Sequence, residues 1–233
     1  MLIQGVTDSI TKHLRDLIIT GELKAGIKVN ETEISNKLGV SRPPLREAFR
    51  RLENENLIIA RPRRGVFVAE MSITDCEHIY EARTMLECEA IRILEEKHIR
   101  TIPEVEVTLE EEKKYIPSDI NNAKDILNFF TVMSAFHRKL IEATENEWIN
   151  RFYVSLSSAL TRYQVLYLHI IGSRETSISD HRLIYESIKG GSYDKAKMET
   201  IEHINRTKAL LEKELCFKFP EICVAQQESA DAH

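Results

Sequence analysis

The sequence predicts a mainly α-helical protein: a large helical bundle preceded by a smaller unit of helices and one β-hairpin. Apolar residues recur at helical spacing over most of the 233 residues, which is the pattern of amphipathic helices. Glycine (8) and proline (6) are scarce, which argues against a disordered or all-β chain. A hydrophobic fraction of 42% is sufficient for packed cores. No run of apolar residues is long enough to cross a membrane, and the N-terminus lacks a signal-peptide pattern.

The first two helices are marked by their end signals. Residues 8–20 place four apolar side chains on one helical face, and Gly21 follows as a stop signal. After a short connector, Asn30 is a good N-cap with Glu33 three residues later. Gly39 is expected to end this second helix.

The third helix begins with two adjacent prolines. Ser41 is expected to cap it, which places Arg42, Pro43 and Pro44 in its first turn. Backbone amides there have no helical partner, so proline loses no hydrogen bond. The buried face of the helix is formed by Leu45, Ala48, Phe49 and Leu52. Two short helices joined by a tight glycine-containing turn are a helix-turn-helix.

A β-hairpin with a basic tip follows. Residues 57–59 and 66–68 favour strands, and the turn between them reads RPRRG. The hairpin completes a winged helix-turn-helix.

Arginines line one side of the third helix and the tip of the hairpin. Arg42, Arg46 and Arg50 fall within about 80° of one another on a helical wheel, away from the apolar face. An arginine near the start of such a helix can donate two hydrogen bonds to guanine in the major groove. At the hairpin, Arg64 and Gly65 suit contact with phosphates. The alternative is a solvated face with no ligand.

Charge divides the chain in the same place. Residues 1–70 hold 12 basic and 9 acidic side chains (net +3), and the remainder holds 20 and 28 (net −8). A basic head on an acidic body favours double-stranded DNA as the partner, with chance asymmetry as the alternative. We predict a DNA-binding domain over 1–70, an all-helical effector-binding and dimerisation domain over 71–220, and a flexible tail over 221–233.

The four cysteines form no CxxC pair, so we expect them to be reduced and the protein to be cytoplasmic, with no membrane partner.

Helical periodicity continues from Ser72, a plausible N-cap, almost to the C-terminus. His137, His181 and His203 lie on three separate predicted helices. They could converge on a divalent metal, zinc or nickel, or form a polar pocket that binds an effector anion directly.

Arg83 is the expected partner for an effector carboxylate, because its guanidinium can donate two parallel hydrogen bonds. The alternative is a surface ion pair with Glu87, four residues later. Tyr163 and Tyr167 could line the same effector cavity, or could simply be packing residues.

Particular runs of sequence resemble a known family. LGVSRPPLREAFRRL followed by PRRGVFV resembles the DNA-binding domain of GntR-superfamily regulators. EARTMLE, FHRKLIEATEN and DHRLIYESIKGGSYDKAKMETIEHI resemble the FadR-type C-terminal ligand-binding domain. The resemblance implies a homodimer on a palindromic operator. It also implies that Arg42 and Arg46 are the main DNA contacts and that Ser41, Arg50 and Gly65 are supporting ones.

The resemblance also implies a metal site, with one departure. The family's ligands are an aspartate four residues before the middle histidine, that histidine and two later ones. The aspartate position here is Met133. Three imidazoles could still hold zinc or nickel together with water or an effector carboxylate.

Together these patterns predict a DNA-binding transcriptional regulator, a repressor controlled by a small carboxylate effector, and not an enzyme. One alternative is a metal-dependent enzyme that uses the three histidines, although the sequence contains no HExxH unit. Another is a DNA-binding protein whose pocket does not respond to an effector.

Overall fold

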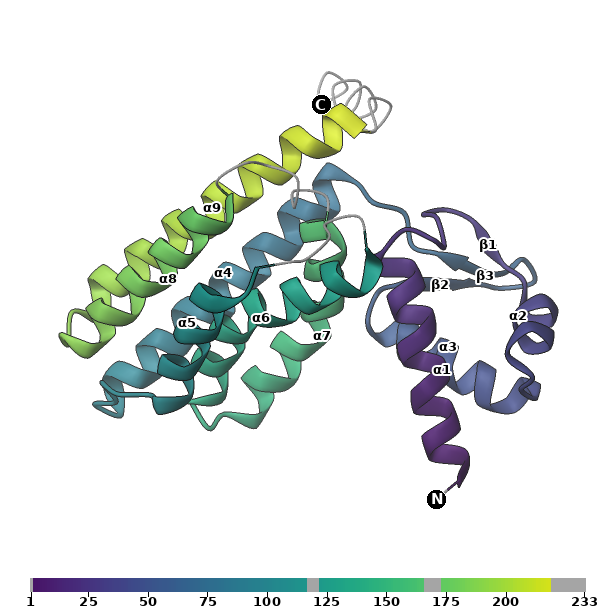
Figure 1. Cartoon of the computed structure of the whole chain (residues 1–233), viewed down its shortest axis with the longest axis horizontal. Coiled ribbons are helices and arrows are strands. Elements are labelled where there is room, and N and C mark those ends of the chain that lie inside the picture. The colour runs from purple at the N-terminus through teal and green to yellow at the C-terminus, as the bar shows by residue number, and fades with distance from the viewer. Residues whose placement is uncertain (1, 117–121, 166–172, 219–233) are drawn as a thin grey trace. The chain divides into compact units, whose positions relative to one another are not determined.

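The computed structural model describes residues 2–116, 122–165 and 173–218 (Figure 1). The chain divides into two compact units, Met1–Met71 with Ser155–Arg162 and Ser72–Val154 with Tyr163–His233. The tail predicted over 221–233, and Tyr167, lie outside the described residues. The predicted mainly helical fold with a small β wing is confirmed.

The first unit is the winged helix-turn-helix. Its elements are α1 (Leu2–Ile19), β1 (Lys28–Val29), α2 (Glu31–Leu38), α3 (Arg42–Asn54), β2 (Ile58–Arg61) and β3 (Gly65–Val68). The strands form one antiparallel sheet in the order β1-β3-β2. The prediction of a plain connector before Asn30 is wrong, because Lys28–Val29 pair with β3 as a third strand.

The helix ends follow the sequence signals with one exception. The Asn30 side chain accepts hydrogen bonds from the amides of Thr32 (3.1 Å) and Glu33 (3.2 Å), which caps α2. Gly39 ends α2 in the left-handed region, at φ 63°. Ser41 occupies the N-cap position of α3, but its side chain makes no capping hydrogen bond, so that prediction is wrong in detail. The fixed φ of the two prolines is what remains to define the start of α3.

The second unit is all helical in its described part. Its helices are α4 (Ile73–Glu96), α5 (Pro103–Lys114), α6 (Ala123–Glu142), α8 (Ser173–Lys189) and α9 (Tyr193–Lys218). It also contains the two ends of α7 (Glu147–Gln164), whose segment Ser155–Arg162 belongs to the first unit. The Ser72 side chain caps α4 by accepting a hydrogen bond from the Asp75 amide at 3.0 Å. In Figure 1, α8 and α9 run side by side as a hairpin, and α9 packs along α4.

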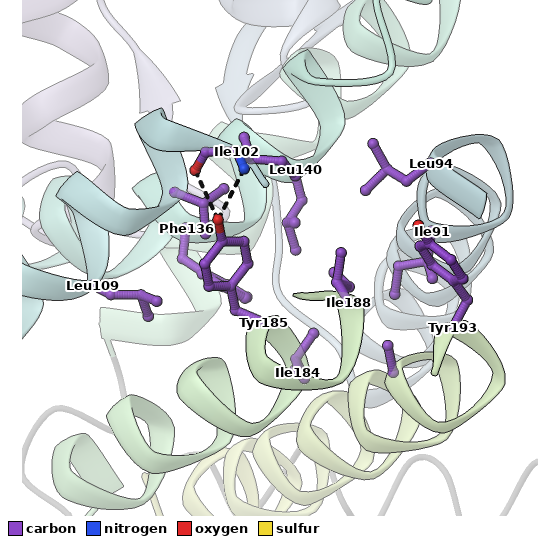
Figure 2. Packing of buried hydrophobic residues seen from close by; sticks show 12 residues of the cluster. Ile91, Leu94, Ile102, Leu109, Phe136, Leu140, Ile184, Tyr185, Ile188 and Tyr193 are labelled. Carbon is purple, nitrogen blue, oxygen red and sulfur yellow. Dashed lines mark hydrogen bonds between the residues drawn. The ribbon is translucent and has the colours of Figure 1, made fainter. Parts of the chain in front are cut away.

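A large apolar cluster holds this bundle together. It contains residues from α4, α5, α6, α8 and α9, among them Ile91, Leu94, Phe136 and Ile188, each of which is fully buried. Figure 2 shows Tyr185 within it, where the hydroxyl accepts from the Ile102 amide (2.8 Å) and lies 3.2 Å from the Ile102 carbonyl oxygen. The start of α5 is therefore fixed to α8, which also carries one of the histidines.

The cysteine prediction is wrong at one position. Cys216 is disulfide-bonded, whereas Cys76 and Cys88 are free thiols. No helix within the described ranges is both long enough and apolar enough to cross a membrane.

Candidate functional site

Helix α3 has two chemically different faces. Leu45, Ala48 and Leu52 are fully buried against the rest of the unit, and Phe49 is 5% exposed. Arg42, Arg46 and Arg50 are all exposed. The apolar face fixes the helix, and the opposite face presents the three guanidinium groups to solvent.

The three arginines differ in how they are held. The Nε of Arg46 lies 3.3 Å from a carboxylate oxygen of Glu31, in the first turn of α2. Arg50 lies 3.7 Å from Glu47. Among the described residues, Arg42 has no ion-pair partner. Surface pairs of this kind contribute about 0–1 kcal/mol, so DNA phosphates or bases can displace them readily.

The wing tip carries further basic groups. Arg61 lies over the ring of Phe67 and 3.6 Å from Glu70, while Arg64 is exposed. Gly65 has φ 105°, and a Cβ there would lie 2.9 Å from the Cε atom of Lys28. The pairing of β1 with β3 therefore brings Lys28 to the wing. Sequence reasoning missed Lys28, because a two-residue strand has too few residues for a periodicity signal.

The second candidate site lies inside the helical bundle. His137 on α6, His181 on α8 and His203 on α9 are each at most 4% exposed. One potential ligand atom from each lies within 4.8 Å of the other two. The ring centroids are 4.6 Å, 4.8 Å and 5.2 Å apart. Three histidines that are far apart in sequence thus form one cluster.

Each histidine is oriented by its own carboxylate. The Nδ1 atom of His137 lies 2.8 Å from Glu87, that of His181 lies 2.9 Å from Glu112, and that of His203 lies 3.1 Å from Asp180. A carboxylate at Nδ1 fixes the ring and does not itself occupy Nε2, which is the usual arrangement behind metal-binding histidines. No local motif pairs these carboxylates with the histidines, so sequence reasoning missed Glu112 and Asp180.

Arg83 joins this cluster. Its Nε donates to Glu87 at 2.7 Å, and its NH2 nitrogen lies 2.7 Å from Nε2 of His137. The alternative of a surface pair with Glu87 is half right, because the pair exists but both side chains are only 2% exposed. The NH1 nitrogen of Arg83 is buried with no hydrogen-bond partner among the described residues.

The protonation states follow from burial and from these neighbours. Burial lowers the pKa of His137 well below its usual range, an effect that Glu87 opposes and Arg83 reinforces. Burial also lowers the pKa of His203 to about 4, although its hydrogen bond with Asp180 opposes the shift. For Glu87, burial raises the pKa, but the charge of Arg83 and the interactions with His137, including the hydrogen bonds to both side chains, together outweigh it and hold the pKa well below the usual range. At neutral pH the two imidazoles are uncharged, the form that coordinates metals.

A cavity of about 20 Å³ lies at the centre of the cluster. It is lined by Arg83, Phe130, Met133, Ser134, His137, Gln164, Ser177, His181, His203 and Thr207. This volume suits one water molecule or one metal ion and is too small for an organic effector. Because the Nε2 atom of His181 is buried there without a hydrogen-bond partner among the described residues, the side chains present fit a metal ion.

Tyr163 does not belong to this set. It is not among the described residues that line the cavity, and its hydroxyl donates to Asp75 at 2.7 Å and accepts from the Ser72 amide at 3.1 Å. The prediction that Tyr163 binds the effector is therefore unsupported, because its hydroxyl bonds to the start of α4. The next residue, Gln164, lines the cavity instead.

A winged helix-turn-helix with an exposed basic face, followed by a separate all-helical bundle, defines a class of DNA-binding proteins. Residues 6–68 match the family described as bacterial regulatory proteins, gntR family. Residues 78–206 match the FCD domain. The chain belongs to the GntR family of transcriptional regulators that carry an FCD domain.

Individual relatives agree with this assignment. The chain is 28% identical over 194 residues to YdhC, an HTH-type transcriptional regulator of Bacillus subtilis, covering 83% of this chain and 85% of that protein. It is 23% identical to the HTH-type transcriptional repressor RspR of Escherichia coli, covering 86% of each. The solved structure of E. coli McbR/YncC has the same fold, with a TM-score of 0.70 and 19% sequence identity. The match covers 89% of this chain and 97% of that one. Since families and relatives are regulators, the protein is a DNA-binding transcription regulator, and the alternative of a metal-dependent enzyme is set aside.

Proposed function

We propose that this regulator is a repressor whose affinity for its operator falls when a small carboxylate effector binds beside the histidine cluster. Arg83 is the observation that carries this proposal. Its buried NH1 nitrogen has no partner among the described residues, although two other nitrogens of the same guanidinium are engaged. An effector carboxylate would satisfy that donor through a charge-assisted hydrogen bond.

DNA reading is assigned to the first unit. Arg42 and Arg46 are expected to contact base edges in the major groove, and Ser41, Arg50, Arg64 and Gly65 to contact the backbone. A homodimer would place two such units on a palindromic operator, with half-sites about one helical turn apart.

The bundle supplies the response. Because the cavity holds only about 20 Å³, an effector must select a state in which the surrounding side chains have moved apart. His137, His181 and His203 would hold a zinc or nickel ion, which would supply a Lewis-acidic position for an effector oxygen. Arg83, fixed through Glu87, would orient the carboxylate.

The small cavity also favours a second candidate, a regulator with a non-responsive pocket. To separate the two, a library of small carboxylates is screened for release of operator DNA from the wild type and from Arg83→Lys. The ammonium of the introduced lysine keeps the charge beside Glu87 but lacks the guanidinium fork. We expect a carboxylate that releases the wild type and is at least about tenfold less potent on the variant. Release by no carboxylate would support the non-responsive pocket, and equal potency on the variant would remove Arg83 from the proposal.

A further inference from the structure

Met133 lies in the same cavity as the three histidines. It is on α6, one turn before His137, so both residues share a helical face. Its side chain is 9% exposed and lines the cavity together with His137, His181 and His203. The flexible methionine side chain also packs against Phe129 and Phe130. A thioether sulfur is therefore the one soft donor among the described residues that line this cavity.

We propose that the cavity is a site for monovalent copper, held by the three imidazoles with Met133 as fourth ligand; this rests on the metal site of the proposed function. Thioether ligands favour Cu(I), whereas imidazoles accept zinc, nickel and copper alike. The carboxylates that would favour harder ions are already engaged at the Nδ1 atoms of the histidines. Apart from the neutral oxygens of Ser134, Gln164, Ser177 and Thr207, the donors that remain in the lining are nitrogen and sulfur.

The charge around the cavity favours a single positive charge. Arg83 balances Glu87, and Arg206 balances Asp180, whose carboxylate it contacts at 2.6 Å and 2.8 Å. Glu112 is fully buried, and its only side-chain partner in the described part of the chain is His181, at 2.9 Å. The set therefore has one uncompensated negative charge when the imidazoles are neutral. A monovalent ion neutralises it, whereas a divalent ion would leave an excess positive charge in a low-dielectric interior.

Arg83 must release His137 before a metal can bind at this site. Its NH2 nitrogen occupies the Nε2 side of His137, so that hydrogen bond must break when a metal binds. The guanidinium stays anchored through Nε to Glu87. Repulsion between the displaced guanidinium and the ion is smaller for a single charge than for a double one, which again favours Cu(I).

The test compares metal affinities of the full-length protein. Cu(I) affinity is measured anaerobically by competition with bicinchoninate, and zinc affinity by competition with a chromophoric chelator. Met133→Leu removes the sulfur at nearly constant volume, so the fold should survive, as thermal unfolding can check. Met198→Leu, at a methionine that is 61% exposed on α9, is the matched control. We expect Met133→Leu to weaken Cu(I) binding at least about tenfold and zinc binding less than about threefold, with the control unchanged.

A second measurement does not depend on a variant's folding. The copper X-ray absorption spectrum of the loaded wild type should contain a copper–sulfur shell in addition to nitrogen, and a nitrogen-only spectrum overturns the proposal. If zinc binds and Met133→Leu leaves Cu(I) affinity unchanged, this inference alone fails. If neither metal binds the wild type, the metal site of the proposed function fails with it.

Discussion

The exposed face of α3 and the histidine cluster of the bundle are built in opposite ways. The arginines of α3 are neighbours in sequence, point into solvent and have weak ion-pair partners or none in the described part of the chain. The residues of the cluster come from α4, α5, α6, α8 and α9, are buried except for the partly exposed Asp180, and are tied to one another at 2.7–3.1 Å. A surface that binds a polyanion needs charged side chains that are exposed to the ligand. An internal site needs charges balanced in advance, because an unpaired buried charge costs several kcal/mol. Substitutions of the α3 arginines should therefore change DNA binding. Substitutions in the histidine cluster should change the stability of the protein or its affinity for metal.

The largest effect is expected from Glu87→Gln. The change leaves the buried guanidinium of Arg83 without its counter-charge, so the free energy of unfolding should fall by about 3–5 kcal/mol. Urea denaturation measures this free energy of unfolding. Glu89→Gln, which alters an exposed pair with Arg92, is the control and should change stability by less than about 1 kcal/mol. Equal small effects at both positions would contradict the buried pair.

Glu112→Gln should reduce zinc affinity by about 10–100-fold, because the carboxylate that orients His181 is lost while the side-chain size is kept. Glu111→Gln changes the exposed neighbour and should leave the affinity unaltered. Competition with a chelator measures the zinc affinity of the wild type and of the two variants. Unchanged affinity in Glu112→Gln would remove the carboxylate from the site.

Gly65→Ala should destabilise the wing by about 1–2 kcal/mol, because φ 105° is strained for alanine and its Cβ would approach Lys28. We expect weaker operator binding together with lower protection of the β3 amides in hydrogen exchange. Protection equal to that of the wild type would show that the glycine is not required for the wing.

The smallest effect is expected from Lys28→Ala. If Lys28 contacts a phosphate, specific and non-specific DNA affinities should fall by a similar factor, and the salt dependence of binding should weaken by about one counterion. Lys37→Ala, another exposed lysine of the first unit, is the control. An unchanged salt slope in Lys28→Ala would place the side chain away from DNA.

The same contrast explains what the sequence could predict. The caps, periodicity and prolines of α3 are local, so its faces follow from a few consecutive residues. The strand β1 depends on pairing with residues 66 and 67, far along the chain, so it has no local signal. In the bundle, the three histidines stand out by their type, but Glu112 and Asp180 do not, because only tertiary packing brings a carboxylate to each imidazole. The hydrogen bond of Tyr163 with Asp75 was unforeseen for the same reason, since helical position alone does not fix where a hydroxyl finds its partner.

The most direct test of DNA reading by α3 is the operator affinity of Arg42→Ala/Arg46→Ala. The operator is first selected from random-sequence DNA by the wild-type protein, and affinity is then measured by mobility shift at fixed salt. Each bidentate arginine contributes about 1–3 kcal/mol, so we predict that the two together cost at least about 30-fold in affinity. Arg92→Ala/Arg138→Ala, in exposed bundle arginines, should stay within about threefold of the wild type. Sequence-specific binding that survives in the Arg42→Ala/Arg46→Ala protein would contradict the account.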